Sequence, residues 1–169
     1  VDDAVGEAFD KVSKMLGFGY PGGPKIQAAA ENGINSDITF PVADLKNKFD
    51  FSFSGLKTSV LRFIQKEFPD GTEIPSAELN KIAYSFQEAA IKALMRNTEK
   101  ALKKYKVNSI SVVGGVAANS LLRKNFKMLA DTYNKKLVIP ELVYCGDNAA
   151  MIAYRGQKIF ESGKRFGLN

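Results

Sequence analysis

The stretch of residues 111–120 has the residue types and spacing of a ligand-binding turn. It reads Ser-Val-Val-Gly-Gly-Val-Ala-Ala-Asn-Ser, so an apolar run stops at Gly114 and Gly115 and leads to Asn119. The apolar run predicts a buried strand. The two glycines lack a Cβ, which allows the backbone to approach a ligand, and a helix starting downstream would offer free N–H groups. The same arrangement also serves as a plain tight connection, so both interpretations stay open.

A candidate carboxylate lies on the first helix that the sequence predicts. Apolar residues over positions 2–16 follow the helical period, Asp2 and Asp3 are expected to open the helix, and Gly17 stands where a helix ends. Asp10 lies one turn after a mid-helix glycine on the same face. We interpret Asp10 either as a ligand to something that comes close there or as a solvated helix carboxylate.

A glycine-rich segment follows this helix. Residues 17–24 read Gly-Phe-Gly-Tyr-Pro-Gly-Gly-Pro, which is too rich in turn residues to be regular. Pro24 suits the first position of a short helix that we expect to reach about Glu31. Gly22 and Gly23 would then stand at a helix N-terminus, where they either receive an anion or a sugar hydroxyl or form a plain loop.

Asp147 is the last candidate, and it comes immediately before another expected helix. Its side chain either caps that helix, a contribution of about 1 kcal/mol, or binds a metal ion. The chain contains no histidine, which excludes Ser-His-Asp and Cys-His nucleophile systems and the His-Glu-x-x-His zinc helix within these residues. Catalysis here would therefore use carboxylates, amides, backbone groups or a metal.

Hydrophobic periodicity predicts the elements that would position these groups. Alternation over residues 49–53 predicts a half-buried strand, and the helical spacing from Ser54 onward predicts a helix. One continuous apolar stripe predicts a long helix from about Ser76 to Lys104. The remaining predicted elements are a strand ending at Gly114, a helix over residues 120–133, a strand over 137–140 and a helix after Asp147.

Composition limits the class of protein. With 169 residues, of which 45% are hydrophobic, the chain can bury one sizeable core, and its length favours one domain. Its apolar runs are far shorter than a membrane helix needs. The single cysteine, Cys145, excludes an internal disulfide and favours a reducing, cytoplasmic location.

The net charge suggests a polyanionic partner. Twenty-four Lys and Arg residues against eighteen Asp and Glu residues give a charge of +6, and RNA is the natural partner to test. The alternative is that the lysines at the end of the long helix only solvate it and complement its dipole. These lysines are Lys100, Lys103, Lys104 and Lys106.

The chain contains five ordered motifs. They are Asp-Asp-Ala-Val-Gly-Glu-Ala-Phe-Asp-Lys at 2–11, Tyr-Pro-Gly-Gly-Pro at 20–24, Asp-Phe-Ser-Phe-Ser-Gly-Leu-Lys-Thr at 50–58, Gly-Gly-Val-Ala-Ala-Asn at 114–119 and Asp-Asn-Ala-Ala-Met-Ile-Ala at 147–153. Together they resemble the TsaD family, and the sequence Phe-Ser-Phe-Ser-Gly-Leu-Lys-Thr is similar to that of bacterial or organellar members. Members of this family make the threonylcarbamoyl modification of adenosine 37 in tRNAs that read codons beginning with A.

The resemblance covers roughly the C-terminal half of such a protein. The family's paired metal histidines and its Ser-Gly-Gly-His-Thr-type phosphate turn have no counterpart here, and the chain begins with Val1. We therefore expect residues 1–169 to be a single fragment that does not modify tRNA alone.

The resemblance also implies a fold. The family belongs to the actin, Hsp70 and hexokinase superfamily, the ASKHA fold, in which two RNase H-like α/β lobes close on a nucleotide. The chain would then form part of the second lobe, with the lobe's first strands missing. Residues 24–106 would be a largely helical insertion, and residues 107–169 a strand-helix-strand-helix part that binds nucleotide.

Site residues are carried over from the family by position. The resemblance implies substrate contacts at Asp10 and Gly23 and a nucleotide-side contact at Asn119, with Asp147 as a metal ligand beside two histidines outside this chain. Supporting backbone is expected at Gly22, Gly114 and Gly115. The expected ligands are threonylcarbamoyl-adenylate or an adenine nucleotide and one divalent metal ion per subunit, iron by family precedent, with zinc or magnesium as alternatives.

In the implied reaction the N6 amine of adenosine 37 attacks the carbamoyl carbonyl of threonylcarbamoyl-adenylate, and AMP leaves. The implied partners are tRNA and proteins of the TsaB and TsaE type, without a membrane. Two alternatives remain: a non-catalytic module of the same fold that senses nucleotide or acts as a scaffold, and a metallopeptidase. The metallopeptidase is disfavoured because the chain has no zinc-peptidase helix.

Overall fold

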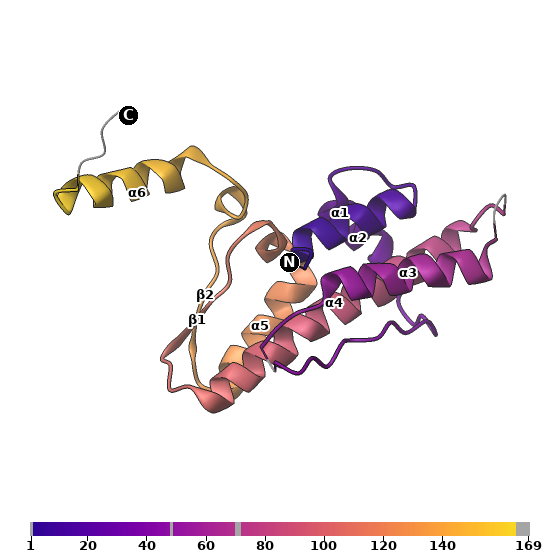
Figure 1. The fold of residues 1–169 in the computed structure, drawn as a ribbon, viewed down its shortest axis with the longest axis horizontal. Coiled ribbons are helices and arrows are strands. Elements are labelled where there is room, and N and C mark those ends of the chain that lie inside the picture. The colour runs from indigo at the N-terminus through magenta and orange to yellow at the C-terminus, as the bar shows by residue number, and fades with distance from the viewer. Residues whose placement is uncertain (1, 48, 70–71, 165–169) are drawn as a thin grey trace.

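The computed structural model describes residues 2–47, 49–69 and 72–164. These residues form a mostly helical α/β structure with a small parallel sheet (Figure 1). In chain order the elements are α1 (Val5–Met15), α2 (Gly22–Glu31), α3 (Phe53–Glu67), α4 (Ser76–Lys104), β1 (Ser109–Ser111), the 3₁₀ helix η1 (Gly115–Ala118), α5 (Ser120–Thr132), β2 (Lys136–Val138), the 3₁₀ helix η2 (Leu142–Tyr144) and α6 (Ala149–Glu161).

The first four helices share one hydrophobic core. Phe9 of α1 and Phe86 of α4 meet within it edge to face, with ring centroids 5.0 Å apart. Ile26 of α2 and Val60 of α3 are fully buried in the same cluster. The long helix predicted over residues 76–104 is confirmed, because α4 has these bounds and its apolar stripe supplies one wall of the core.

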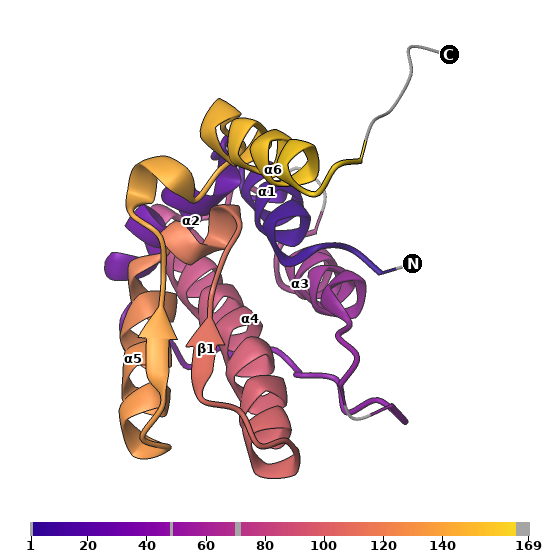
Figure 2. The ribbon, with the colours of Figure 1, turned by 90° about the vertical axis from the view of Figure 1, so that its left-hand side faces the viewer.

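A second, smaller core joins α4, α5 and the sheet. It is built from Ile91 of α4, Ile110 of β1, and Leu122 and Phe126 of α5. β1 and β2 pair in parallel, with Ile110 opposite Leu137, and α5 makes the crossover between them (Figure 2). The two strands and the intervening helix that the sequence predicted are thus confirmed.

Helix α1 ends as predicted but begins differently. Gly17 has φ of +75°, and the N–H of Phe18 donates to the carbonyl of Ser13 at 2.9 Å, the pattern of a Schellman C-cap. Asp2 and Asp3 do not open the helix, which starts at Val5.

The two N-terminal aspartates bind helix α3 instead. The carboxylate of Asp2 accepts from the backbone N–H of Ser54 at 2.8 Å, and Asp3 pairs with Lys57 at 2.8 Å. Their position is therefore decided by charges and donors on α3, which lie more than fifty residues away in the sequence.

The strand predicted over residues 49–53 is wrong. Phe49 lies in a turn, residues 50–52 pair with no described strand, and α3 already begins at Phe53. Asn97 of α4 donates to the carbonyl of Asp50 at 2.7 Å, and Arg96 donates to the carbonyls of Val42 and Ala43, which lie before this segment. The period-two alternation of residue types therefore does not form a strand here.

Helix α2 begins at Gly22, two residues before the predicted start. Pro24 is consequently its third residue, while Pro21 occupies the N-cap position without a side-chain hydrogen bond. The earlier start brings Gly22 and Gly23 into the helix, so their backbone N–H groups belong to its first turn.

Helix α6 lies apart from the helical bundle, connected through η2 (Figure 1). None of its residues is buried, and Met151 and Ile152 are 52% and 69% exposed. Within the three described stretches, no helix is both long and apolar enough to cross a membrane.

Candidate functional site

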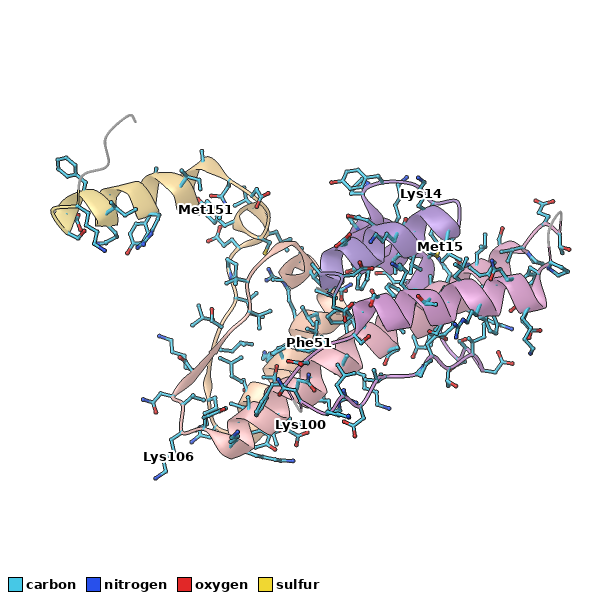
Figure 3. All side chains as sticks on the ribbon, viewed as in Figure 1. Lys14, Met15, Phe51, Lys100, Lys106 and Met151 are labelled. Carbon is cyan, nitrogen blue, oxygen red and sulfur yellow. The ribbon has the colours of Figure 1, made fainter. Side chains whose placement is uncertain are left out.

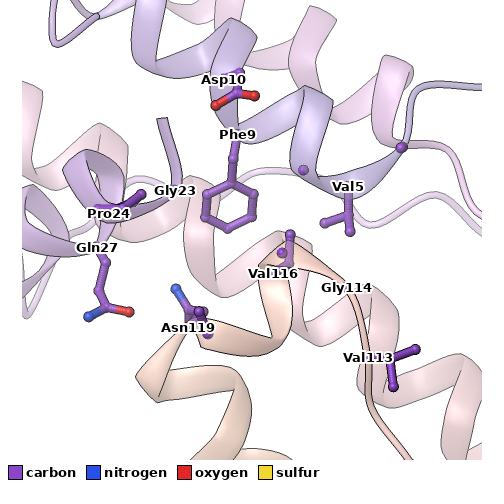
Figure 4. A pocket seen from close by; sticks show the side chains of 14 residues that line it. Val5, Phe9, Asp10, Gly23, Pro24, Gln27, Val113, Gly114, Val116 and Asn119 are labelled. Atoms are coloured by element: carbon purple, nitrogen blue, oxygen red, sulfur yellow. The ribbon is translucent and has the colours of Figure 1, made fainter. Parts of the chain in front are cut away.

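A pocket of about 570 Å³ lies where the first turns of α1 and α2 face the glycine turn after β1 (Figure 4). Residues from the beginning and from the last third of the chain meet there. The pocket is lined by five of the seven predicted site residues, which are Asp10, Gly23, Gly114, Gly115 and Asn119. The structure therefore brings together three of the predicted sequence motifs. It leaves Gly22 and Asp147 outside the lining.

Most of the pocket wall is apolar. Val5 and Phe9 contribute from α1, and Val113 and Val116 come from the glycine turn (Figure 4). A Cβ on Gly6 would lie 3.5 Å from Cγ2 of Val116, which is an ordinary van der Waals contact, so the packing of α1 against η1 leaves room for a methyl group at this position. An apolar cavity with a few convergent polar groups suits a ligand that combines a flat ring with a polar chain.

The carboxylate of Asp10 connects α1 to α2. Its Oδ1 accepts a hydrogen bond from the backbone N–H of Gly22 at 2.7 Å. A negative charge at a helix N-terminus is favourable because the first N–H groups lack intrahelical partners. Asp10 is thus more than a solvated carboxylate, and its Oδ2 makes no hydrogen bond to any residue that the structure describes.

The two glycines at the start of α2 have different surroundings. A Cβ on Gly22 would lie only 2.5 Å from Cα of Asp10 and 2.6 Å from the carbonyl oxygen of Phe9, so the close approach of the two helices excludes a side chain. A Cβ on Gly23 would meet no atom within 4 Å, and this position borders the pocket. The N–H of Gly23 donates to no described residue, so it is available to a ligand.

Asn119 has a structural role as well as a place in the pocket wall. Its Oδ1 caps α5 by accepting from the N–H of Leu122 at 3.0 Å, and its Nδ2 donates to Oε1 of Gln87 at 2.7 Å. One amide hydrogen and one lone pair are left for a ligand. The buried partner Gln87 was not predicted, because nothing in its sequence neighbourhood marks it.

Gln27 was also missed by the sequence analysis. It lines the pocket, and its Oε1 accepts from the N–H of Ser120 at 2.9 Å, which connects α2 to α5. Its spacing of four residues after Gly23 puts both on one face of α2, which is the signal that could have found it.

The expectation of free N–H donors at the start of α5 is wrong for two of its residues. The N–H of Ser120 is taken by Gln27 and that of Leu122 by Asn119. Gly114 is the N-cap residue of η1 and Gly115 is its first residue, so both belong to η1 and not to the start of the longer helix. Gly114 has φ of +91° and ψ of 171°, a conformation essentially restricted to glycine, while a Cβ on either residue would meet no atom within 4 Å.

Asp147 is exposed and lies in the loop before α6. The interpretation of Asp147 as a helix cap is wrong, because Asn148 caps α6 by accepting from the N–H of Met151 at 3.0 Å. Its role as a metal ligand stays a prediction. In the part of the chain that the structure describes, no three His, Cys, Asp or Glu side chains gather as a metal site would require.

Arg123 connects the glycine turn to the loop that leads to Asp147. Its Nε donates to the carbonyl of Ala117 in η1 at 2.6 Å, and its Nη2 donates to the carbonyl of Pro140 at 2.8 Å. Because a guanidinium holds several acceptors in a fixed planar geometry, Arg123 fixes the two segments relative to each other.

Comparison with known proteins identifies the family of this chain. The family model described as TsaD, tRNA N6-adenosine threonylcarbamoyltransferase, matches residues 1–154. The protein of that name from Thermosipho africanus is 49% identical over 164 residues, which cover 96% of this chain and 48% of the relative. The one from Carboxydothermus hydrogenoformans is 48% identical over 170 residues, which cover 100% of this chain and 49% of the relative. The chain spans about half the length of these relatives. On the strength of these matches, the chain belongs to the TsaD family.

Proposed function

We propose that this chain supplies the adenylate-binding part of a tRNA N6-adenosine threonylcarbamoyltransferase. The whole protein would transfer the threonylcarbamoyl group from threonylcarbamoyl-adenylate to N6 of adenosine 37 in tRNAs that read codons beginning with A. Membership of the TsaD family supports this proposal. The single observation that carries it is the pocket in which Asp10, Gly23 and Asn119 meet the Gly114–Gly115 turn.

Each polar group of the pocket has a use in holding an adenylate. The free Oδ2 of Asp10 would accept hydrogen bonds from a ribose hydroxyl or an amide, and the N–H of Gly23 would donate to an oxygen of the ligand. Phe9 and Val116 offer apolar contact to the adenine ring. The remaining amide hydrogen of Asn119 would donate from the α5 side of the pocket.

The transfer itself makes one bond and breaks one. The N6 nitrogen attacks the carbamoyl carbon and a C–N bond forms, N6 gives up one proton to solvent water, and the bond from the carbamoyl carbon to the phosphate oxygen breaks as AMP leaves. In this proposal the residues of the chain chiefly orient the adenylate. Holding two reactants in the right orientation lowers the activation free energy by a large amount in reactions of this kind.

The metal ion is part of the same proposal. Asp147 would hold it together with two histidines from outside this chain, with iron the expected ion and zinc or magnesium as alternatives. The exposed carboxylate of Asp147 fits that role because it is a hard oxygen ligand with no hydrogen-bond partner among the described residues. A bound divalent ion would neutralise phosphate and polarise the carbamoyl carbonyl.

The wider context is proposed as well. The parallel pair of β1 and β2 with its α5 crossover is compatible with an RNase H-like lobe of the actin and Hsp70 type. Proteins of the TsaB and TsaE type would be partners of the whole protein, and the cytoplasm its location. We propose the lobe type, the partner proteins and the location because the chain belongs to the TsaD family.

Calorimetric titration with threonylcarbamoyl-adenylate tests the proposal, together with a transfer assay on an unmodified tRNA that reads codons beginning with A. In the whole protein, Asp10→Asn should weaken adenylate binding by about 1.5–3 kcal/mol, because it removes a hydrogen bond to a charged group. Asp131→Asn on the exposed surface of α5 is the matched control and should bind normally.

The outcomes separate the candidate functions. Equal affinity for the two folded variants would contradict the adenylate site. Tight adenylate binding without any transfer by the whole protein would favour the nucleotide-sensing module over the enzyme.

A further inference from the structure

A second concave surface lies at the far end of α4, and it shares no lining residue with the pocket described above. This groove of about 660 Å³ is lined by Lys46 and Phe49 from the segment before α3 and by lysines of the last turns of α4. We call the groove and the lysines beside it the basic end. Its lysines are Lys46, Lys100, Lys103, Lys104 and Lys106.

Several of these charges are not neutralised. Lys46, Lys104 and Lys106 form no ion pair with any carboxylate in the described part of the chain. Lys100 lies 3.4 Å from Asp44 and Lys103 lies 2.8 Å from Glu99; both pairs are exposed, and such pairs contribute little to stability. An incoming phosphate can therefore compete for the lysines without breaking a strong internal contact.

Helix-dipole compensation does not account for the arrangement. A dipole effect acts within the last turn of a helix, which would explain Lys103 and Lys104. Lys46 comes from a different segment, more than fifty residues earlier, and Lys106 lies beyond the helix. The fold thus gathers lysines from separate segments at one place. Figure 3 shows Lys100 and Lys106 at this end of the molecule, away from Lys14 on α1.

Aromatic rings lie among the lysines. The Nζ of Lys104 stands 5.0 Å from the ring centroid of Phe49 and 5.3 Å from that of Tyr105, and the two rings are 5.9 Å apart. Tyr105 is 51% exposed. Phe49 is half-buried, so Tyr105 is the ring that a base can reach. An exposed ring beside unpaired ammonium groups is the combination that binds single-stranded nucleic acid, in which bases stack and phosphates contact lysine. A membrane or an acidic protein would not need the stacking surface.

The distance from the basic end to the pocket suits one extended ligand. Lys106 precedes β1, whereas Gly114 at its other end lines the pocket. Eight residues of extended chain span at most about 26 Å. An RNA that offers one base to an adenylate bound in the pocket can therefore contact the basic end with phosphates from a neighbouring part of the same molecule.

We propose that the basic end binds phosphates and an unpaired base of RNA, and so holds the nucleic acid while one of its bases reaches the pocket. The identification of that RNA as the tRNA substrate rests on the proposed function. The surface itself is inferred from the positions of the lysines and rings at the end of α4.

The test compares two triple variants of the whole protein with the same change in net charge. One replaces Lys46, Lys104 and Lys106 by glutamine. The control replaces Lys14, Lys92 and Lys124, which are exposed and do not line the groove, in the same way. Affinity for unmodified tRNA is measured by fluorescence anisotropy over a range of salt concentrations, and adenylate affinity by calorimetry.

We expect the basic-end variant to lose about tenfold or more in tRNA affinity and to lower the slope of log affinity against log salt by about 2 to 3. The control should change both far less, and neither variant should alter adenylate binding. A Tyr105→Ala exchange should lower tRNA affinity by about tenfold at every salt concentration without changing the slope.

Equal losses in the two triple variants would overturn the proposal. So would binding to vesicles of anionic lipid that depends on the three basic-end lysines while tRNA binding does not. If tRNA binding depends on the basic end but the whole protein transfers nothing from the adenylate, the surface stands and the proposed function fails.

Discussion

Alanine at Gly23 should stabilise the fold, whereas alanine at the neighbouring Gly22 should destabilise it. A Cβ at Gly23 meets nothing within 4 Å, so the exchange adds helix propensity without a clash. Gly-to-Ala changes at compatible positions raise the free energy of unfolding by about 0.4–1 kcal/mol. The position lies in the first turn of α2, which favours the lower end of that range.

At Gly22 the same methyl group would lie 2.5 Å from Cα of Asp10. Gly22 belongs to α2 and Asp10 to α1, and the two helices pack in one hydrophobic core. Overpacking of this kind costs about 1–3 kcal/mol. The shift that relieves it would also lengthen the hydrogen bond from the Gly22 N–H to Asp10. We expect a total loss of roughly 2–4 kcal/mol in the free energy of unfolding.

Gly23 should matter for ligand binding, although the fold tolerates a side chain at this position. Gly23→Val fills part of the pocket, so it should weaken binding of threonylcarbamoyl-adenylate by about tenfold or more while the protein stays folded. Urea denaturation measures stability, and calorimetry on the whole protein measures affinity. A marked destabilisation by Gly23→Ala, or unchanged affinity in Gly23→Val, would refute the assignment of this glycine to the pocket wall.

Three further changes test other parts of the structure. Asp147→Asn should leave the midpoint of thermal unfolding nearly unchanged but reduce metal content and transfer, since Asn148 already caps α6; full metal content, measured by elemental analysis, would exclude the ligand role. Asn119→Ala should lower the free energy of unfolding by about 2–4 kcal/mol, because it removes a helix cap and leaves the buried amide oxygen of Gln87 without its donor; a urea titration that gives less than half of this loss would contradict it. The hydrogen bond from Lys57, and next that from Lys11, hold the pKa of the Asp3 carboxyl below its usual value. The folded state therefore gains stability from the Asp3 carboxylate above the unfolded pKa of about 3.9 and loses it as the pH falls through the lower folded pKa. Asp3→Asn should therefore flatten the decline in urea midpoints below about pH 4, and an unchanged decline would show that Asp3 does not contribute to it.

Hydrophobic periodicity predicted helix α4 correctly, because that helix depends on a pattern within its own residues. The stripe of α4 extends over many turns, so its period was unambiguous and its bounds were correct. The alternation over residues 49–53 was equally regular, yet it does not form a strand, because α3 begins at Phe53 and Asn97 of α4 binds the carbonyl of Asp50. Which partner satisfies an extended backbone depends on tertiary contacts that no short window contains.

The same distinction applies to the pocket. Motif resemblance predicted Asp10, Gly23 and Asn119 as members of one site, and the structure brings them to one cavity. It did not predict that Asn119 uses one amide hydrogen and one oxygen lone pair to bind Gln87 and the first turn of α5. Gln87 lies more than thirty residues away, and the other partner is the backbone N–H of Leu122, so the residue types around Asn119 do not predict either contact.

The central claim is that one adenylate occupies the pocket between α1, α2 and the glycine turn. Amide chemical-shift mapping of the protein with a non-hydrolysable analogue of threonylcarbamoyl-adenylate tests it most directly. We predict saturable shifts at the amides of Gly23, Gly114 and Gly115, with those of Lys104 and Lys106 unchanged. Saturable shifts confined to any other surface, or none at these three glycines at saturating ligand, would contradict the account.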